Sequence, residues 1–330
     1  MFDLGFERVA DWIKGRGHSS VALQMPEGLK PRAMDFAGRL NEMGVSAIIL
    51  GDPCYGACDL DRDYKEWADA LIHFGHSPIP SMGDDPDILF VEVSFDGDVG
   101  PMVAAVADSL PSRVGLLATV QYVGCIPAAA RAIEDSGRVA VVGMGDARIA
   151  HPGQVLGCNV SSAESVSGEV DGYLFLGEGD FHPLAASFAC DKPVLVLNPI
   201  SGETRSLDEK RDRMLRVRFA AIERAKDATS FLVLVCSKAG QTREADARDA
   251  VDAIRAAGKR ANVAVMAEIN PDALLPYDVD AYVCTGCPRI AMDDAALYGK
   301  PMLTPQEARI ALGLEHWDDY AFDAIRPDQS

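Results

Sequence analysis

The strongest constraint on the fold of this 330-residue chain is one order of segments that occurs three times. Each copy has an apolar run of strand length, an amphipathic segment of helix length, a second apolar run, and a third run that begins with Asp and has Gly at its seventh position. Strands that alternate with helices in this way indicate an α/β fold with mostly parallel sheets. The third runs are Asp69–His76 (DALIHFGH), Asp171–Glu178 (DGYLFLGE) and Asp280–Cys287 (DAYVCTGC).

The repeated glycines, Gly75, Gly177 and Gly286, are 102 and then 109 residues apart. This period is longer than that of a solenoid repeat, so it predicts three similar small α/β domains, which we expect to lie about a pseudo-threefold axis. The alternative is that the strands of any parallel α/β protein look alike. A charged segment, 201–228, has apolar residues at helical spacing and predicts one long connecting helix. We place the domains at 1–108, 109–205 and 206–330.

Charge and hydropathy exclude several classes of protein. The chain has 50 acidic and 31 basic residues, a net charge of −19, which argues against direct binding of nucleic acid. Its apolar runs are too short to span a membrane. The first residues include Asp3, Glu7 and Asp11 and lack the basic start of a signal peptide. We therefore expect a cytoplasmic protein, in which eight scattered cysteines favour metal binding or simple burial over disulfides.

Three of the cysteines follow predicted strands in different copies. Cys58 and Cys158 come after the second apolar runs of the first and second copies, and Cys287 is the last residue of the third run of the third copy, directly after its apolar part. Ligands bind at the carboxyl ends of the strands in parallel α/β sheets. Three domains could thus bring one thiolate each to a common centre, which suits an iron-sulfur cluster with one iron left open.

The stretch GDPCYGACDL does not form a complete cluster motif by itself. Cys54 and Cys58 supply CxxxC, but Asp61 stands where the common radical enzymes that use S-adenosylmethionine have the last cysteine of CxxxCxxC. We therefore interpret Cys54 as support for the loop. Cys284 and Cys287 form CxxC, yet an odd offset on a strand points the two side chains to opposite faces. A metal shared by these two would require the strand to end before Cys287. Cys236 and Cys284 are most simply small buried side chains, and Cys125 and Cys190 have no partner at a metal-binding spacing.

Six segments in this order resemble the archaeal 2-(3-amino-3-carboxypropyl)histidine synthase family, the iron-sulfur enzymes of diphthamide biosynthesis. They are GDPCYGACDL, GQVLGCNV, FLGEGDFHPLA, SKAGQ, CTGCPRIAMDD and PMLTPQEA, and they extend over nearly the whole chain. The resemblance implies a homodimer of three-domain protomers. It also implies a 4Fe-4S cluster in each protomer, held by Cys58, Cys158 and Cys287, the same three cysteines that follow the predicted strands.

The activity that the resemblance implies is transfer of the 3-amino-3-carboxypropyl group of S-adenosylmethionine to imidazole C2 of a histidine in translation elongation factor 2. The bond broken is that between sulfur and the methionine γ-carbon, by a one-electron route that needs an electron donor of unknown identity. We assign no catalytic residue beyond the cluster. Glycine amides, a lysine and glutamines in strand-end loops could hold the methionine carboxylate, although each could also be a turn residue. These candidates are Glu27, Gly28, Gln121, Gly177, Gly179, Lys238 and Gln241.

Two other functions remain open at this point. Quinolinate synthase also has three similar domains and a cluster bound by one cysteine from each, but the ordered segments fit the diphthamide enzymes better. A non-catalytic structural partner of the same fold is the second alternative, and the presence of all three motif cysteines argues against it.

Overall fold

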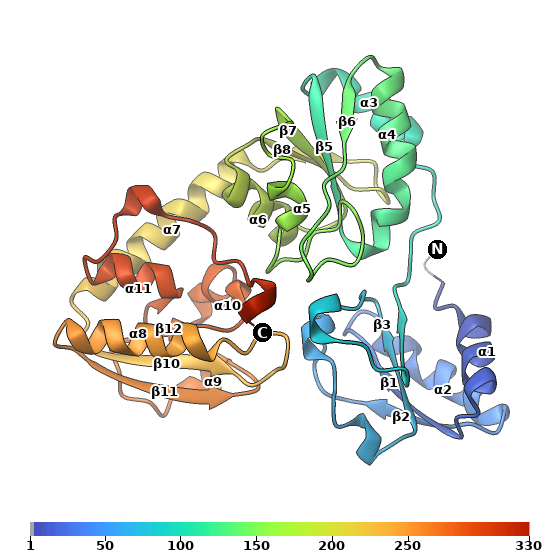
Figure 1. The fold of residues 1–330 in the computed structure, drawn as a ribbon, viewed down its shortest axis with the longest axis horizontal. Helices are drawn as coiled ribbons and strands as arrows, with labels where there is room; N and C mark the ends of the chain where they lie inside the picture. Colours follow the sequence, from blue (N-terminus) through green and yellow to red (C-terminus); the bar gives the residue numbers. More distant parts are fainter. Residues whose placement is uncertain (1–2, 330) are drawn as a thin grey trace.

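The computed structural model describes residues 3–329 and contains three separate sheets, one in each lobe of Figure 1. In the first sheet the strand order is β2-β1-β3-β4, and all of the pairs are parallel. The alternation of buried apolar runs with amphipathic helices explains this arrangement. Each crossover helix returns the chain to the end of the sheet where the previous strand began, so the next strand runs parallel to it. The strands are β1 (Ser20–Gln24), β2 (Ser46–Leu50), β3 (Ala70–Phe74) and β4 (Ile88–Val91).

The other two sheets repeat this order. The second is β6-β5-β7-β8 with an added antiparallel β9, and the third is β11-β10-β12-β13. The predicted α/β fold with three mostly parallel sheets is confirmed, whereas the pseudo-threefold relation of the domains stays a prediction. The second sheet has β5 (Arg113–Ala118), β6 (Val139–Val141), β7 (Gly172–Leu176), β8 (Val194–Leu197) and β9 (Thr204–Ser206). The third has β10 (Ser230–Cys236), β11 (Arg260–Met266), β12 (Ala281–Cys284) and β13 (Met302–Leu303).

The aspartate that opens each repeated run has the same task in all three sheets. Asp69 Oδ2 accepts hydrogen bonds from the backbone N–H groups of Ser19 and Ser20, both at 3.0 Å, where β1 begins. Asp171 and Asp280 accept equivalent bonds at the starts of β5 and β10. The carboxylate therefore ties the third strand of each copy to the central strand, which gives a physical reason for the repeat.

Helices cover the sheets and join them. The predicted connecting segment contains α7, a helix of 19 residues that packs against α6 of the second domain and α11 of the third. The helices of the first two domains are α1 (Phe6–Arg16), α2 (Ala33–Glu42), α3 (Gly100–Val106), α4 (Ile126–Asp135), α5 (Ser161–Glu164) and α6 (Phe181–Cys190). The remaining helices are α7 (Asp208–Lys226), α8 (Glu244–Ala256), α9 (Pro271–Leu274), α10 (Pro288–Met292) and α11 (Pro305–Ala311).

Packing at two places crosses the domain limits expected from the sequence. Val99 and Val103, at the start of α3 and within it, are buried in the core of the second sheet, so that core begins before residue 109. At the other end of the chain, Phe322 packs against the second domain, and Ile325 N–H donates to the carbonyl of Cys158 at 2.7 Å. The C-terminal segment thus returns from the third domain to the second.

None of the helices formed by residues 3–329 has the length and apolar character needed to cross a bilayer.

Candidate metal centre

The three strand-end cysteines are close enough to influence one another. Burial raises the pKa of the Cys58 thiol, and Asp59 and the Cys158 thiol raise it further. Burial also raises the pKa of Cys287, with further contributions from the Cys158 and Cys58 thiols. The thiols of the three domains therefore affect one another electrostatically, which is consistent with the expected common centre.

Each cysteine belongs to a short local structure that follows a strand. Cys58 lies in a 3-10 helix, Ala57–Asp59, after β2. Cys158 lies in the loop that follows β6, and Cys287 is the N-cap residue of α10, just after β12. All three residues are only partly exposed, and within the described residues all of the cysteines are free thiols.

Two glycines permit the close packing around these thiols. A Cβ atom on Gly240, in the loop after β10, would lie 2.6 Å from the Cβ of Cys58. A Cβ atom on Gly157, next to Cys158, would lie 1.8 Å from the ring of Phe181. Real Cβ atoms do not approach other atoms this closely, so a side chain at either position would push the loops apart.

The loop after β10 also makes polar contacts with the Cys58 segment. Gln241 Nε2 donates a hydrogen bond to Cys58 Sγ at 3.1 Å. Lys238 Nζ lies 3.0 Å from Asp59 Oδ1 and 2.5 Å from Glu268 Oε1. The third domain thus brings an N–H donor to the sulfur and an ion pair to the neighbouring aspartate.

Arg148 was not expected from the sequence, where an arginine in a polar loop gives no sign that it is buried. Its side chain is completely buried, and Nη2 donates to the Gly240 carbonyl at 3.0 Å. Burial raises the pKa of Cys158, whereas the charge of the Arg148 guanidinium and its hydrogen bond to that thiol lower it. Arg148 also lowers the pKa of Cys58, so one buried cation favours the thiolate form of two of the three cysteines.

Among the residues predicted to bind S-adenosylmethionine, Lys238 and Gln241 lie beside Cys58 and already contact protein groups there. Gln121 Nε2 donates a hydrogen bond to the carbonyl of Gly75, the residue before His76, at 2.6 Å. This bond joins the second domain to the first. The other candidates lie in the turns after β1 and β7: Glu27 pairs with Lys30, Gly28 and Gly179 are exposed, and Gly177 is buried.

The remaining cysteines are mostly buried, which agrees with the interpretation of Cys236 and Cys284 as small buried side chains. Cys54, Cys125, Cys236 and Cys284 have buried side chains, and Cys190 is half-buried. Cys54 lies near His73 and His76 instead of joining the three strand-end cysteines. Neither histidine was predicted as a site residue, although their spacing, HxxH, is visible in the sequence.

These donors fit a 4Fe-4S cluster with three protein ligands. Three thiols come from three domains, two of them already accept hydrogen bonds from Gln241 and Arg148, and a buried cation lies beside the same two. Clusters of this kind need thiolate ligands, and N–H donors to sulfur tune their potentials.

Known proteins similar to this chain are consistent with an iron-sulfur site. The family model described as "Putative diphthamide synthesis protein" matches residues 25–321. The chain belongs to the diphthamide synthesis family. It is 38% identical to the 2-(3-amino-3-carboxypropyl)histidine synthase of Pyrococcus horikoshii over 95% of this chain and 91% of the relative. It is 31% identical to subunit 1 of the Gallus gallus synthase, over 96% of this chain and 79% of the relative.

A solved structure within the family has the same fold. The crystal structure of Dph2 from Pyrococcus horikoshii with a 4Fe-4S cluster matches with a TM-score of 0.90 and 35% identity, over 98% of this chain and 95% of that chain. Membership of the diphthamide synthesis family decides against the quinolinate synthase alternative.

Proposed function

We propose that this chain is a 2-(3-amino-3-carboxypropyl)histidine synthase that catalyses the first step of diphthamide formation. In that step the 3-amino-3-carboxypropyl group of S-adenosylmethionine moves to imidazole C2 of a histidine in translation elongation factor 2. The observation that carries the proposal is the meeting of loops from all three domains beside Cys58, where Gly240 packs against this cysteine and accepts a hydrogen bond from the buried Arg148. Relatives named for this synthase match over almost the whole chain, which also supports it.

In this proposal Cys58, Cys158 and Cys287 hold a 4Fe-4S cluster. When bound, the cluster supplies the single electron needed to cleave the bond between the sulfonium and the methionine γ-carbon. The chain's own groups stabilise the negative charge on the sulfur ligands. Gln241 does so by its hydrogen bond to Cys58, and Arg148 by its charge beside Cys158.

Orientation of S-adenosylmethionine is the other task of the protein, because the position of the sulfonium decides which of its three carbon bonds is broken. Lys238 and Gln121 are suited to this task, since each belongs to a strand-end loop and contacts a neighbouring domain. To bind the methionine carboxylate, Lys238 would have to release Glu268 and pair with the substrate carboxylate instead. Glu268 is the more exposed of its two partners, 42% against 1% for Asp59. Glu27, Gly28, Gly177, Gly179 and Gln241 complete the set of proposed contacts.

The proposed partners are elongation factor 2, a second copy of the chain in a homodimer, and an electron donor, all in the cytoplasm. With a net charge of −19, the chain would present acidic surface to a partner, and basic groups on that partner would favour the encounter.

The test is a cleavage assay on anoxically purified protein with a full cluster, a strong reductant and S-adenosylmethionine. We expect methylthioadenosine as the nucleoside product and, with elongation factor 2 present, a mass increase on one histidine. Deoxyadenosine as the main product would overturn the assigned bond. A loaded, reduced protein that yields neither nucleoside would overturn the enzyme assignment and favour the non-catalytic alternative.

A further inference from the structure

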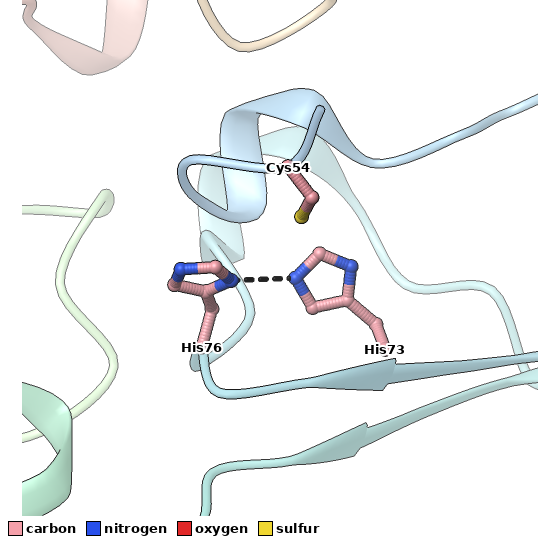
Figure 2. A group of neighbouring side chains, drawn as sticks. All are labelled: Cys54, His73 and His76. Atoms are coloured by element: carbon pink, nitrogen blue, oxygen red, sulfur yellow. Dashed lines mark hydrogen bonds between the residues drawn. The ribbon is translucent and has the colours of Figure 1, made fainter. Parts of the chain in front are cut away.

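Cys54, His73 and His76 form a second group of metal-binding side chains within the first domain (Figure 2). Cys54 comes from the loop after β2, His73 from β3 and His76 from the turn after β3. The side chains of Cys54 and His73 are 1% and 0% exposed, and His76 is half-buried. One donor atom from each residue lies within 4.8 Å of the other two.

Hydrogen bonds determine which ring nitrogen of His73 carries the proton. Gln24 Nε2 donates to the carbonyl of Asp59 at 2.8 Å, which turns Gln24 Oε1 toward His73 Nδ1, also at 2.8 Å. An amide oxygen only accepts, so His73 carries its proton on Nδ1 and has its lone pair on Nε2. Metal-binding histidines are held in the same way, with the N–H that does not face the metal donated to an oxygen.

The lone pair of His73 is directed at the second histidine. His73 Nε2 lies 2.9 Å from His76 Nδ1, and Figure 2 shows the Cys54 sulfur beside this contact. Burial lowers the pKa of His76 to about 4 and that of His73 well below its ordinary value. Both rings are therefore neutral at neutral pH, which is the form that binds a metal ion.

We propose that Cys54 Sγ, His73 Nε2 and His76 Nδ1 bind a zinc ion that is distinct from the cluster of the three strand-end cysteines. One thiolate and two imidazoles form a donor set that zinc prefers, and three protein ligands leave the fourth position for water. In the metal-free chain the proton between the two imidazoles occupies the place of the cation.

The distances require only small movements. Tetrahedral zinc, with Zn–N near 2.0–2.1 Å and Zn–S near 2.3 Å, places two nitrogens about 3.3 Å apart and sulfur about 3.5 Å from each nitrogen. The contact between the histidines would open by about 0.4 Å, and the thiol would approach by about 1.3 Å at most, within the reach of side-chain rotation.

The position of the group indicates what the zinc ion would do. Cys54 and Cys58 bracket one loop, and the intervening Tyr55 N–H is bonded to Asp59 Oδ2 at 2.6 Å. Zinc on Cys54 would tie this loop to β3 and so add to the hydrogen bond that already shapes it. Zinc binding would thus explain how Cys54 supports the loop, the role expected of it from the sequence.

The test measures zinc directly. Cluster-loaded protein, purified without oxygen, is dialysed against dilute zinc and analysed for zinc and iron by mass spectrometry. We expect about one zinc per chain in addition to the iron. The Cys54→Ser variant should bind zinc at least about tenfold more weakly, and Gln24→Leu about 10–100-fold more weakly through loss of the bond that orients His73. Cys284→Ala, which removes another buried thiol, should leave zinc binding unchanged.

Cobalt reports the ligands and separates this site from the cluster site. In the background Cys58→Ser, Cys158→Ser, Cys287→Ser, added cobalt should show a thiolate-to-metal absorption band and the visible bands of tetrahedral coordination. His76→Gln, a change at the least buried of the three ligands, should weaken both. Circular dichroism establishes that each variant is folded. Absence of zinc from folded wild-type protein, or unchanged affinity in folded Cys54→Ser, would overturn the proposal. A cobalt spectrum without the thiolate band would do so as well.

Discussion

Gln241 of the third domain donates a hydrogen bond to the sulfur of Cys58 in the first domain, at 3.1 Å, although the two residues are 183 positions apart in the chain. This bond joins two domains at the proposed cluster site. It also lowers the pKa of a thiol that burial otherwise raises.

Replacing Gln241 with Leu should make the cluster harder to reduce. An N–H donor on a sulfur ligand stabilises the more negative, reduced form, so its loss lowers the reduction potential. In the metal-free protein the loss of one hydrogen bond should cost about 0.5–1.5 kcal/mol of stability. A redox titration followed by electron paramagnetic resonance measures the potential. Gln306→Leu, on α11 of the same domain, is the control, and equal potentials in both variants would contradict the prediction.

Single changes of Cys58, Cys158 or Cys287 to Ala should each remove the normal 4Fe-4S spectrum, because each removes one of the three proposed protein ligands. Cys54→Ala should leave the cluster largely intact, since that thiol lies with His73 and His76. The measurement is the iron content and absorption spectrum of anoxically reconstituted protein. A normal cluster in any of the first three variants would refute the ligand assignment for that cysteine.

Acid should weaken the first domain through Asp69. Its hydrogen bonds from Ser19 and Ser20 lower its pKa to about 2 from an ordinary value of 3.8. The folded-state pKa is the lower one, so the stabilisation is complete above about pH 4 and is lost as the pH falls toward 2. Urea unfolding at pH 5 and pH 3 should show a smaller loss on acidification for Asp69→Asn than for wild type. Asp35→Asn, on the surface of α2, should behave like wild type; a wild-type response from Asp69→Asn would count against this role.

The buried ion pair in the third domain should be costly to break from one side. Arg218 of α7 and Glu307 of α11 are both fully buried, with Arg218 Nε 2.7 Å from Glu307 Oε1. Arg218→Met leaves an uncompensated carboxylate and should cost about 3–5 kcal/mol, whereas the double change with Glu307→Leu should recover most of that loss. Urea unfolding of the two single variants and the double variant measures this coupling. Additive costs would show that the pair is not coupled.

The three-domain order could be predicted because it depends on local patterns. Apolar runs, amphipathic segments and the Asp-to-Gly spacing of Asp69–His76 are readable within a few residues, and the same strand order in the three sheets agrees with them. The topology rule that ligands lie at strand ends then selected Cys58, Cys158 and Cys287.

Contacts between domains could not be predicted in the same way. Arg148 is 92 residues from Gly240, and no local pattern indicates that its guanidinium is buried or that it lies beside Cys158. The return of the C-terminal segment to Cys158 through Ile325 is equally invisible in the sequence.

The sequence by itself thus determined the three sheets and which cysteines follow their strands. Strand and helix periodicity is a property of neighbouring residues, so it can be recognised locally. Only the tertiary structure decided which groups surround those cysteines. Gln241, Arg148 and the pairing of Cys54 with His73 and His76 depend on how loops from separate strands dock. That docking is decided by burial and shape complementarity between segments far apart in the chain, which no local pattern encodes.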